Sequence, residues 1–548
     1  MNTFKNSVVY QIYPKSFLDT NGDGLGDLRG VIEKLDYLRT LGVDYIWLTP
    51  FFVSPQNDNG YDVADYRAID PRYGTMEDFE ELVAQARTRN IKIMLDMVFN
   101  HTSTSHVWFQ KALAGDPVYR DYYIFRPGKP QGGPPTNWES KFGGNAWEYV
   151  PQLDQYYLHL FDKTQADLNW ENPAVRREVQ DIVRFWMEKG VKGFRFDVVN
   201  LISKGEYADD TQGDGRRFYT DGPRIHEFLR ELNRESFGKD PEIITVGEMS
   251  STSMENCFRY AGADGQELSM VFSFHHLKVD FVGNEKWVLV PADFGKLKEI
   301  LFSWQEGMAA HGAWNAVFWC NHDQPRVVSR FGDEGEYWKQ SAKMLANVIH
   351  AMRGTPYIYQ GEELGMTNAG FTSLDQYRDV ESLNHYRILR DKGMSRESVY
   401  NILKVHSRDN SRTPMQWTGE EQGGFTTGQP WISVNPNTRT INAESQVGDP
   451  DSIFAHYQAL IRLRKEYPVF AQGDFRALSQ EDPQVLAYQR RWENTSLICL
   501  SNFYRKETTW QAPLDLTGYR VLLSNYPDSL PAQSWKLRPY ESVLLIKE

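Results

Sequence analysis

The chain has 548 residues, of which 41% are hydrophobic and 14% aromatic, and its formal net charge is −13. The length exceeds what one ordinary core takes, so we expect two or three domains, and the composition excludes a disordered chain. The negative charge argues against nucleic acid and anionic membranes as general partners. It also means that an anionic substrate would need a local basic pocket.

The sequence contains no targeting or spanning segment that we can identify. The N-terminal stretch MNTFKNSVVYQIYPKSF lacks the apolar core of a signal peptide, and no run of about 18 apolar residues occurs. The three cysteines, Cys257, Cys320 and Cys499, are widely spaced and form no CxxC pair. We therefore expect buried thiols in a cytoplasmic protein, not a disulfide scaffold or a zinc site. We also expect that the protein has no membrane partner and that it is a monomer.

Short apolar runs alternate with amphipathic helical patterns through most of the chain. Helical patterns occur at 28–41, 76–89, 173–189, 223–236, 292–308, 337–353 and 452–466. Eight strand-like runs occur at 8–14, 43–50, 91–101, 191–200, 242–249, 268–274, 313–323 and 355–365. This alternation predicts an α/β fold, a (β/α)₈ TIM barrel, with a doubly wound sheet as the alternative.

Two connections and the C-terminal region depart from the alternation. Residues 102–167 are rich in Gly, Pro and aromatics and are too long for a structureless loop, so we predict a small inserted domain after the third strand. Residues 366–450 predict a helical excursion after the eighth strand. Alternating runs in 476–548 predict a C-terminal antiparallel β-sandwich domain. The barrel would then comprise 1–101 and 168–475.

Charged and polar residues lie near the C-terminal ends of the predicted strands. In the run VKGFRFDVVN, Arg195 and Asp197 are two residues apart and face the same side of a strand. A lone charge in a protein interior costs several kcal/mol, so this side should not be a dry core. Similar positions hold Asp96, Asn100, His101, Glu248, His322 and Asp323. In a barrel these strand ends converge on the face where active sites form.

Three carboxylates at one barrel mouth indicate glycoside chemistry. Glycoside cleavage uses one carboxylate as nucleophile or base and a protonated carboxylic acid beside it. Arg195 would keep Asp197 ionised, because a nearby cation lowers the pKa of a carboxylate. Glu248, framed by ITVGEM, has apolar neighbours that could raise its pKa, as a general acid requires.

The motifs DMVFNH (96–101), QADLNW (165–170), GFRFDVVN (193–200), GEM (247–249) and NHD (321–323) resemble those of the α-amylase superfamily of glycoside hydrolases, in the same order. The resemblance implies that Asp197 is the nucleophile, Glu248 the acid/base and Asp323 a transition-state stabiliser. It implies that His101 and His322 bind the glycosyl unit and that Arg195 orients Asp197. It also implies retention through a covalent glycosyl-enzyme.

Further motifs resemble the α-glucosidase branch, whose members take one glucosyl unit in a closed pocket. NDNGYD supplies Asp58 and Tyr61, and Asp58 would hold the hydroxyls of the terminal glucose. Phe142 and Phe161 of the inserted segment would form apolar walls. Arg412, in SRDNSRTPMQW, matches an arginine from the loop after strand eight.

The stretch DTNGDGLGD (19–27) has the oxygen spacing with which a calcium loop begins, D-x-N-x-D-G. The twelfth position is Gly30 instead of glutamate, so it is not a regular EF-hand. A bare turn is the alternative. In the glucosidase branch this stretch resembles a structural calcium loop, which could also take magnesium. The resemblance implies that the ligands are Asp19, Asn21, Asp23, Asp27 and the Leu25 carbonyl.

The barrel and the three carboxylates do not identify the substrate, but other stretches of the sequence narrow it. Val198 after the nucleophile is similar to the branch acting on α-1,6-linked or compact disaccharides. Residues 247–260 and 267–287 resemble the branch that hydrolyses trehalose 6-phosphate to glucose and glucose 6-phosphate. Oligo-1,6-glucosidases, which tend to carry an acidic residue where His275 stands, are the alternative. We weighed a non-catalytic transporter subunit, which would carry a transmembrane helix and lack the carboxylates.

A sugar phosphate would need a cationic site near the mouth, since the chain is acidic overall. The segment HHLKVDFVGNEKW offers His275, His276, Lys278 and Lys286 just past the sixth strand. We expect these four residues to line the side where the leaving glucose 6-phosphate sits. The alternative is that the two lysines are ordinary solvated side chains.

Overall fold

The structure is a computed structural model that describes residues 3–548. Eight parallel strands close into a barrel in the order β1-β15-β14-β13-β12-β11-β5-β2. Closure confirms the predicted TIM barrel and excludes the doubly wound sheet. The strands are β1 (Val9–Ile12), β2 (Tyr45–Leu48), β5 (Lys92–Met97), β11 (Gly193–Phe196), β12 (Ile244–Met249), β13 (Met270–Ser273), β14 (Asn315–Val317) and β15 (Thr355–Tyr359).

Helices surround the barrel, and their first residues explain where they begin. Thr75 forms a capping box with Asp78 at the start of α4, and Pro173 follows the cap residue Asn172 at the start of α7. The predicted helix 28–41 is wrong as a single element, because the chain leaves helical geometry at Lys34. The helices are α2 (Leu28–Glu33), α3 (Leu35–Leu41), α4 (Met76–Thr88), α7 (Pro173–Glu188), α9 (Ile225–Glu235), α11 (Phe294–Ala310), α13 (Trp338–His350) and α18 (Ile453–Glu466).

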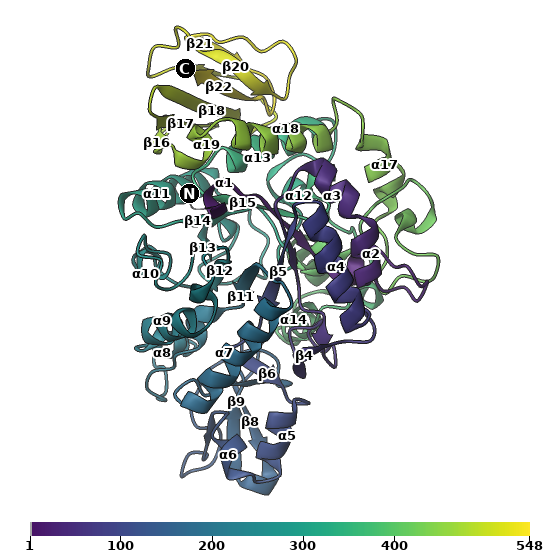
Figure 1. Cartoon of the computed structure of the whole chain (residues 1–548), viewed down its shortest axis with the longest axis vertical. Helices are drawn as coiled ribbons and strands as arrows, with labels where there is room; N and C mark the ends of the chain where they lie inside the picture. The colour runs from purple at the N-terminus through teal and green to yellow at the C-terminus, as the bar shows by residue number, and fades with distance from the viewer. Residues whose placement is uncertain (1–2) are drawn as a thin grey trace.

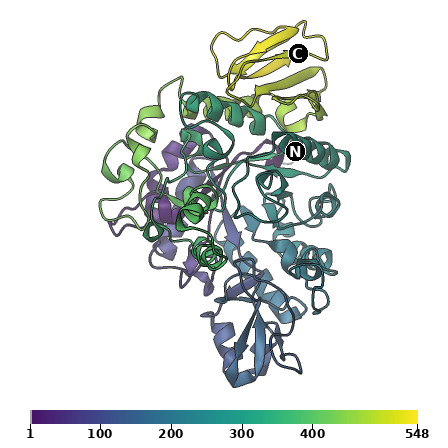
Figure 2. The same ribbon diagram turned by 180° about the vertical axis from the view of Figure 1, so that it is seen from behind.

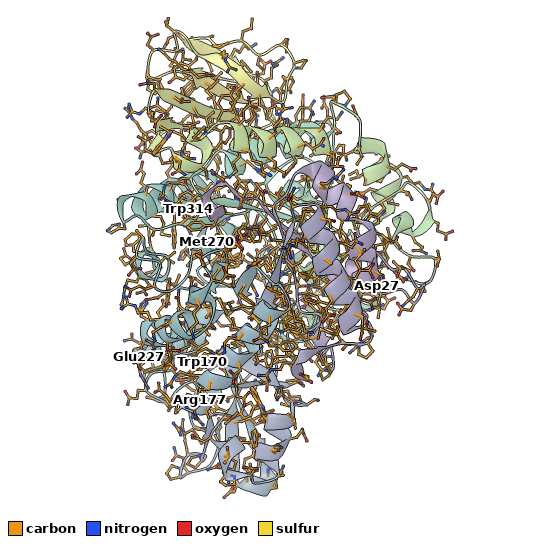
Figure 3. The ribbon with its side chains drawn as sticks, viewed as in Figure 1. Asp27, Trp170, Arg177, Glu227, Met270 and Trp314 are labelled. Atoms are coloured by element: carbon orange, nitrogen blue, oxygen red, sulfur yellow. The ribbon has the colours of Figure 1, made fainter. Side chains whose placement is uncertain are left out.

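The segment after the third barrel strand projects from the body of the molecule (Figures 1 and 2). Its base is an antiparallel pair, β6 (His101–Ser103) with β10 (Gln165–Asp167). Beyond this pair lies a three-stranded sheet of β7 (Phe125–Arg126), β9 (Gln155–Leu158) and β8 (Trp147–Val150). In Figure 3 the labelled Trp170 lies next to this segment, whereas Trp314 and Met270 lie nearer the opposite end of the molecule.

The C-terminal residues form the antiparallel sheet domain that the sequence predicts. Five strands pair in the order β16-β17-β18-β22-β20, and β19 pairs with β21. Trp510 and Trp535 of the two-stranded sheet pack with Val485 and Ile498 of the larger sheet in one apolar cluster. The strands are β16 (Arg476–Ala477), β17 (Val485–Trp492), β18 (Thr495–Asn502), β19 (Thr508–Gln511), β20 (Arg520–Ser524), β21 (Ser534–Leu537) and β22 (Ser542–Lys547).

The connection after β15 forms the predicted helical excursion and reaches the barrel mouth. It contains α14 (Val380–Asp391), α15 (Arg396–His406) and the short α16 (Asp409–Arg412). The three cysteines are buried and free, as predicted. Across residues 3–548, no helix is long and apolar enough to cross a bilayer.

Candidate active site

Barrel register brings Arg195 and the catalytic candidates together. Arg195 on β11 lies opposite Asp96 on β5 and Val246 on β12, and Glu248 follows two residues later on β12. The barrel strands end earlier than the predicted runs, at Phe196 in β11 and at Val317 in β14. Asp197 and Asp323 therefore lie just beyond strand ends, at the mouth.

Arg195 is the centre of an ionic network with three carboxylates. Its Nη1 donates to Asp96 Oδ1 at 2.7 Å and to Asp197 Oδ1 at 2.6 Å, while Nη2 donates to Glu248 Oε2. Only 1% of the Arg195 side chain is exposed. A buried cation of this kind is tolerated because it is paired and hydrogen-bonded. The space that Arg195 and Asp197 face is thus the barrel mouth.

Two of the three candidate catalytic carboxyls have pKa values shifted in opposite directions. Burial raises the pKa of Glu248 well above its usual range, and the negative charge of Asp197 adds to the rise, although Arg195 opposes it. Burial would also raise the pKa of Asp323, but His322 and Arg408 hold it well below its usual range. Such separation of carboxyl pKa values is how glycosidases assign an acid and an ionised group.

The mouth opens into a cavity of about 230 Å³. Ten of the residues predicted for catalysis or substrate binding line it: Asp58, Tyr61, His101, Phe142, Phe161, Asp197, Glu248, Lys278, Lys286 and Asp323. Arg195, His322 and Arg412 are absent from the lining and support residues that do line it. Val198 also lines the cavity, and its own backbone φ is 35°, where it precedes the short turn Val199–Leu201.

Neutral histidines support the floor of the cavity. The Tyr61 ring stacks on His322 with centroids 5.0 Å apart, and His322 Nε2 lies 3.2 Å from Asp323 Oδ2. His101 Nε2 lies 3.1 Å from the Tyr61 carbonyl oxygen. Burial lowers the pKa of both His101 and His322, so each imidazole can donate from one nitrogen and accept at the other.

Arg408 is a site residue that the sequence analysis missed. It pairs with Asp58 at 3.0 Å, with Asp379 at 2.5 Å and with Asp323 at 3.2 Å, and it lines the cavity. Arg412, which was predicted, contacts Asp323 at 2.7 Å from beneath. Both arginines lie in the motif SRDNSR, so the sequence did point to an arginine from this loop. Spacing alone does not say which of the two reaches the cavity.

Gln165 was also missed, although it lies in a motif that the analysis quoted. Its Nε2 donates to Asp58 Oδ2 at 3.1 Å, and the residue lines the cavity. Gln165 begins β10, so it approaches the mouth from the base of the inserted segment. Its position depends on the pairing of β6 with β10, which the sequence pattern did not predict.

The four residues predicted for the phosphate separate into two pairs. Lys278 and Lys286 line the cavity, as expected. His275 and His276 do not line it, and their assignment to the phosphate stays a prediction. His276 Nε2 lies 2.9 Å from the Phe318 carbonyl oxygen, and the His275 ring packs 4.9 Å from the Trp304 ring. Both histidines point behind the strand end, toward the barrel wall.

In the loop 19–27, hydrogen bonds within the loop engage the oxygens predicted to bind calcium. Asp19 accepts from the backbone N–H groups of Asn21, Gly22 and Gly24. Asp27 caps α2 by accepting from the Gly30 N–H at 2.7 Å. Within residues 3–548 no group of three or more His, Cys, Asp or Glu side chains is arranged to hold a metal ion. Calcium binding at this loop stays a prediction.

Residues 11–473 match the family described as Alpha amylase, catalytic domain. The chain therefore belongs to the alpha-amylase family. It is 57% identical over 547 residues to the trehalose-6-phosphate hydrolase of Bacillus subtilis strain 168, covering 99% of this chain and 97% of that protein. It is 46% identical over 551 residues to the oligo-1,6-glucosidase of Halalkalibacterium halodurans, covering 98% of each. The crystal structure of Bacillus licheniformis trehalose-6-phosphate hydrolase superposes with a TM-score of 0.96 at 56% identity, covering 100% of both chains.

Proposed function

We propose that this protein hydrolyses trehalose 6-phosphate to glucose and glucose 6-phosphate, with retention, through a covalent glucosyl-enzyme. The observation that supports a phosphorylated substrate is the position of Lys278, which lines the cavity with its ammonium group unpaired within residues 3–548. No ion pair or hydrogen bond to its Nζ occurs within residues 3–548. The names of the relatives above support the same substrate.

Asp197 attacks the anomeric carbon in the first step, while Glu248 protonates the departing glycosidic oxygen. In the second step Glu248 takes a proton from water, which displaces Asp197. One guanidinium, that of Arg195, contacts both carboxyls through its two terminal nitrogens. This bridge supports the separation of about 5–5.5 Å that retention uses, not the wider gap of inverting enzymes.

The other side of the cavity would bind the transferred glucosyl unit. Asp58 and Asp323, both paired with Arg408, present carboxylate oxygens to sugar hydroxyls. Phe142 and Phe161 pack edge-on, 5.5 Å apart, and close one wall. A fixed set of oxygens beside an aromatic wall favours a single terminal glucose.

The alternative is an oligo-1,6-glucosidase, since such relatives are 45–47% identical over nearly the whole chain. A neutral isomaltose would leave Lys278 without a partner in the cavity. An unpaired, partly buried ammonium is costly, and a phosphate would offset that cost.

The test is hydrolysis of trehalose 6-phosphate, trehalose and isomaltose under the same conditions. We expect the highest kcat/KM for trehalose 6-phosphate, with glucose 6-phosphate released in equal amount to glucose. Proton NMR early in the reaction should show α-glucose before mutarotation. A higher kcat/KM for isomaltose would establish the alternative, and β-glucose as first product would exclude retention.

We further propose that loop 19–27 binds a structural calcium or magnesium ion through Asp19, Asn21, Asp23, Asp27 and the Leu25 carbonyl. The support is the alternation of oxygen-bearing residues in a loop whose exposed Asp23 and Asn21 remain accessible. The ion would have no part in the chemistry. A cytoplasmic location and a monomeric state stay predictions as well.

A further inference from the structure

Lys141 is a cation of the inserted segment that the catalytic scheme does not use. Its Nζ donates a hydrogen bond to Ser250 Oγ at 3.2 Å and lies 5.5 Å from the centre of the Tyr219 ring. In the part of the chain that the structure describes, no carboxylate forms an ion pair with it. Lys141 itself does not line the cavity, but its neighbour Phe142 and its hydrogen-bond partner Ser250 both do, so its ammonium group lies directly behind the cavity wall.

Other cations surround Lys141. Burial and the charges of Arg216 and Lys278 lower the pKa of Lys141 to about 8, and Arg216 also acts on Lys278. Arg216, at the start of α8 (Arg216–Tyr219), pairs with Asp214 at 2.5 Å, and its Nη1 makes no bond within residues 3–548. The carboxylates of Asp214, Glu139 and Glu248 lie near enough to act on Lys141 or Arg216, but of the three cations only Arg216 forms an ion pair within residues 3–548.

We propose that Lys141, Ser250 and Lys278 bind the phosphate of the leaving sugar, with Arg216 adding positive charge behind them. This inference rests on the proposed function and names the residues that would bind the phosphate. A phosphate monoester carries about −1.5 to −2 charges at neutral pH and offers three acceptor oxygens, which matches two ammonium groups without an ion-pair partner within residues 3–548 and a hydroxyl. Lys286 is a weaker candidate, because Glu381 already pairs with it at 3.0 Å.

The position of Ser250 links this corner to the chemistry. Ser250 follows Glu248 by two residues, and both residues line the cavity. Asn200 holds the backbone of Ser250 in two directions: it accepts from the Ser250 N–H and donates to the Ser250 carbonyl, both at 2.9 Å. These bonds fix the backbone of Ser250, and the hydrogen bond from Lys141 holds its hydroxyl oxygen before substrate arrives, which lowers the entropic cost of binding.

The test compares Lys141→Met with Lys163→Met, an exposed lysine of the same inserted segment. Methionine keeps an unbranched stem to pack on Tyr219 and removes the charge together with the hydrogen bond to Ser250. For each variant, kcat/KM is measured with trehalose 6-phosphate and with an unphosphorylated aryl α-glucoside, and inhibition is measured with glucose 6-phosphate and with glucose. We expect Lys141→Met to lower the ratio of the two kcat/KM values by about 10- to 100-fold, the range of one charge-assisted contact. Glucose 6-phosphate should also lose its advantage over glucose as an inhibitor.

Each outcome decides the inference. A ratio that falls for Lys141→Met and stays at the wild-type value for Lys163→Met supports it. A proportional loss on both substrates would mean that Lys141 supports the fold of the mouth, and an unchanged ratio would mean that it does not touch the phosphate; either result overturns the inference. Wild-type enzyme that prefers isomaltose would instead refute the proposed function, so the two failures are distinguishable.

Discussion

The two sides of the cavity treat charge differently. On the glucosyl side, Arg195, Arg408 and Arg412 are each paired with carboxylates of the same chain. On the side proposed for the phosphate, which we call the phosphate side, the ammonium groups of Lys141 and Lys278 lack a carboxylate partner within residues 3–548. Residues of both sides line one cavity: Asp58, Asp323 and Arg408 on the first, and Ser250 and Lys278 on the second.

The difference corresponds to the charge of what each side would bind. A neutral glucosyl unit brings no charge, so the protein must balance its own buried ions, and the balanced network also fixes the geometry before substrate arrives. A phosphate brings its own negative charge, so the cations proposed to bind it need no carboxylate partner in the free protein. Breaking a pair on the first side should therefore harm chemistry and folding, whereas removing a cation on the second should harm recognition alone.

The largest expected effect is loss of the carboxyls that react. Asp197→Asn and Glu248→Gln should each lower kcat by several powers of ten, because a nucleophile or acid/base has no substitute. Circular dichroism and the unfolding midpoint serve as the control that each variant is folded. A variant that keeps a tenth of the wild-type kcat would mean that its residue does not have the role assigned to it.

Removing the cation of the glucosyl side should cost stability as well as activity. Arg195→Met leaves Asp96, Asp197 and Glu248 without their shared partner, and breaking a buried pair in this way costs about 3–5 kcal/mol of unfolding free energy. Denaturant unfolding measures the loss. The matched control is Arg29→Met, whose partner Asp78 lies at the surface, and the expected cost there is about 0–1 kcal/mol. Equal losses in both variants would contradict the comparison.

Removing a cation of the phosphate side should change selectivity. Lys278→Ala should lower the ratio of kcat/KM for trehalose 6-phosphate to that for an aryl α-glucoside by about 10- to 100-fold, as one charge-assisted contact does. Lys286→Ala should lower the same ratio less, because Lys286 already pairs with Glu381. If the order of the two variants were reversed, the unpaired state of Lys278 would not be the property that matters.

The raised pKa of Glu248 gives a prediction about pH. A general acid must be protonated, so activity should fall as pH rises past this pKa, and the raised value moves that fall above the usual range of glutamate. An aryl glucoside with a good leaving group needs less protonation, so its kcat should decline less at high pH than that of trehalose 6-phosphate. Identical profiles for both substrates would assign the decline to another group.

Sequence reasoning predicted the barrel and the three carboxyls because both leave local signals. Alternating elements mark a barrel, and Arg195 with Asp197 violates the apolar pattern of a strand. It missed Arg408, since only the folded loop decides which arginine of SRDNSR reaches Asp58 and Asp323. It did not foresee that His275 and His276 lie outside the cavity lining, where His275 packs on Trp304 and His276 contacts the Phe318 carbonyl oxygen. It did not find Lys141, whose partner Ser250 is 109 residues away.

The smallest expected effect is removal of the ion proposed for loop 19–27, which lies outside the comparison of the two cavity sides. A strong chelator should lower the apparent melting temperature, because a ligand that binds only the folded state stabilises it by about 2.7 kcal/mol when free ion is at 100 times its Kd. The activity of still-folded enzyme should change less, since none of the loop's residues lines the cavity. Asp23→Ala provides the matched control: Asp23 is exposed and, among the residues that the structure describes, its carboxylate accepts only the Leu25 N–H, so the variant should melt like chelated wild type and respond no further to chelator. An unchanged melting temperature for a demonstrably metal-free wild-type sample would refute the ion and leave the loop to its own hydrogen bonds, among them those of Asp19 and Asp27.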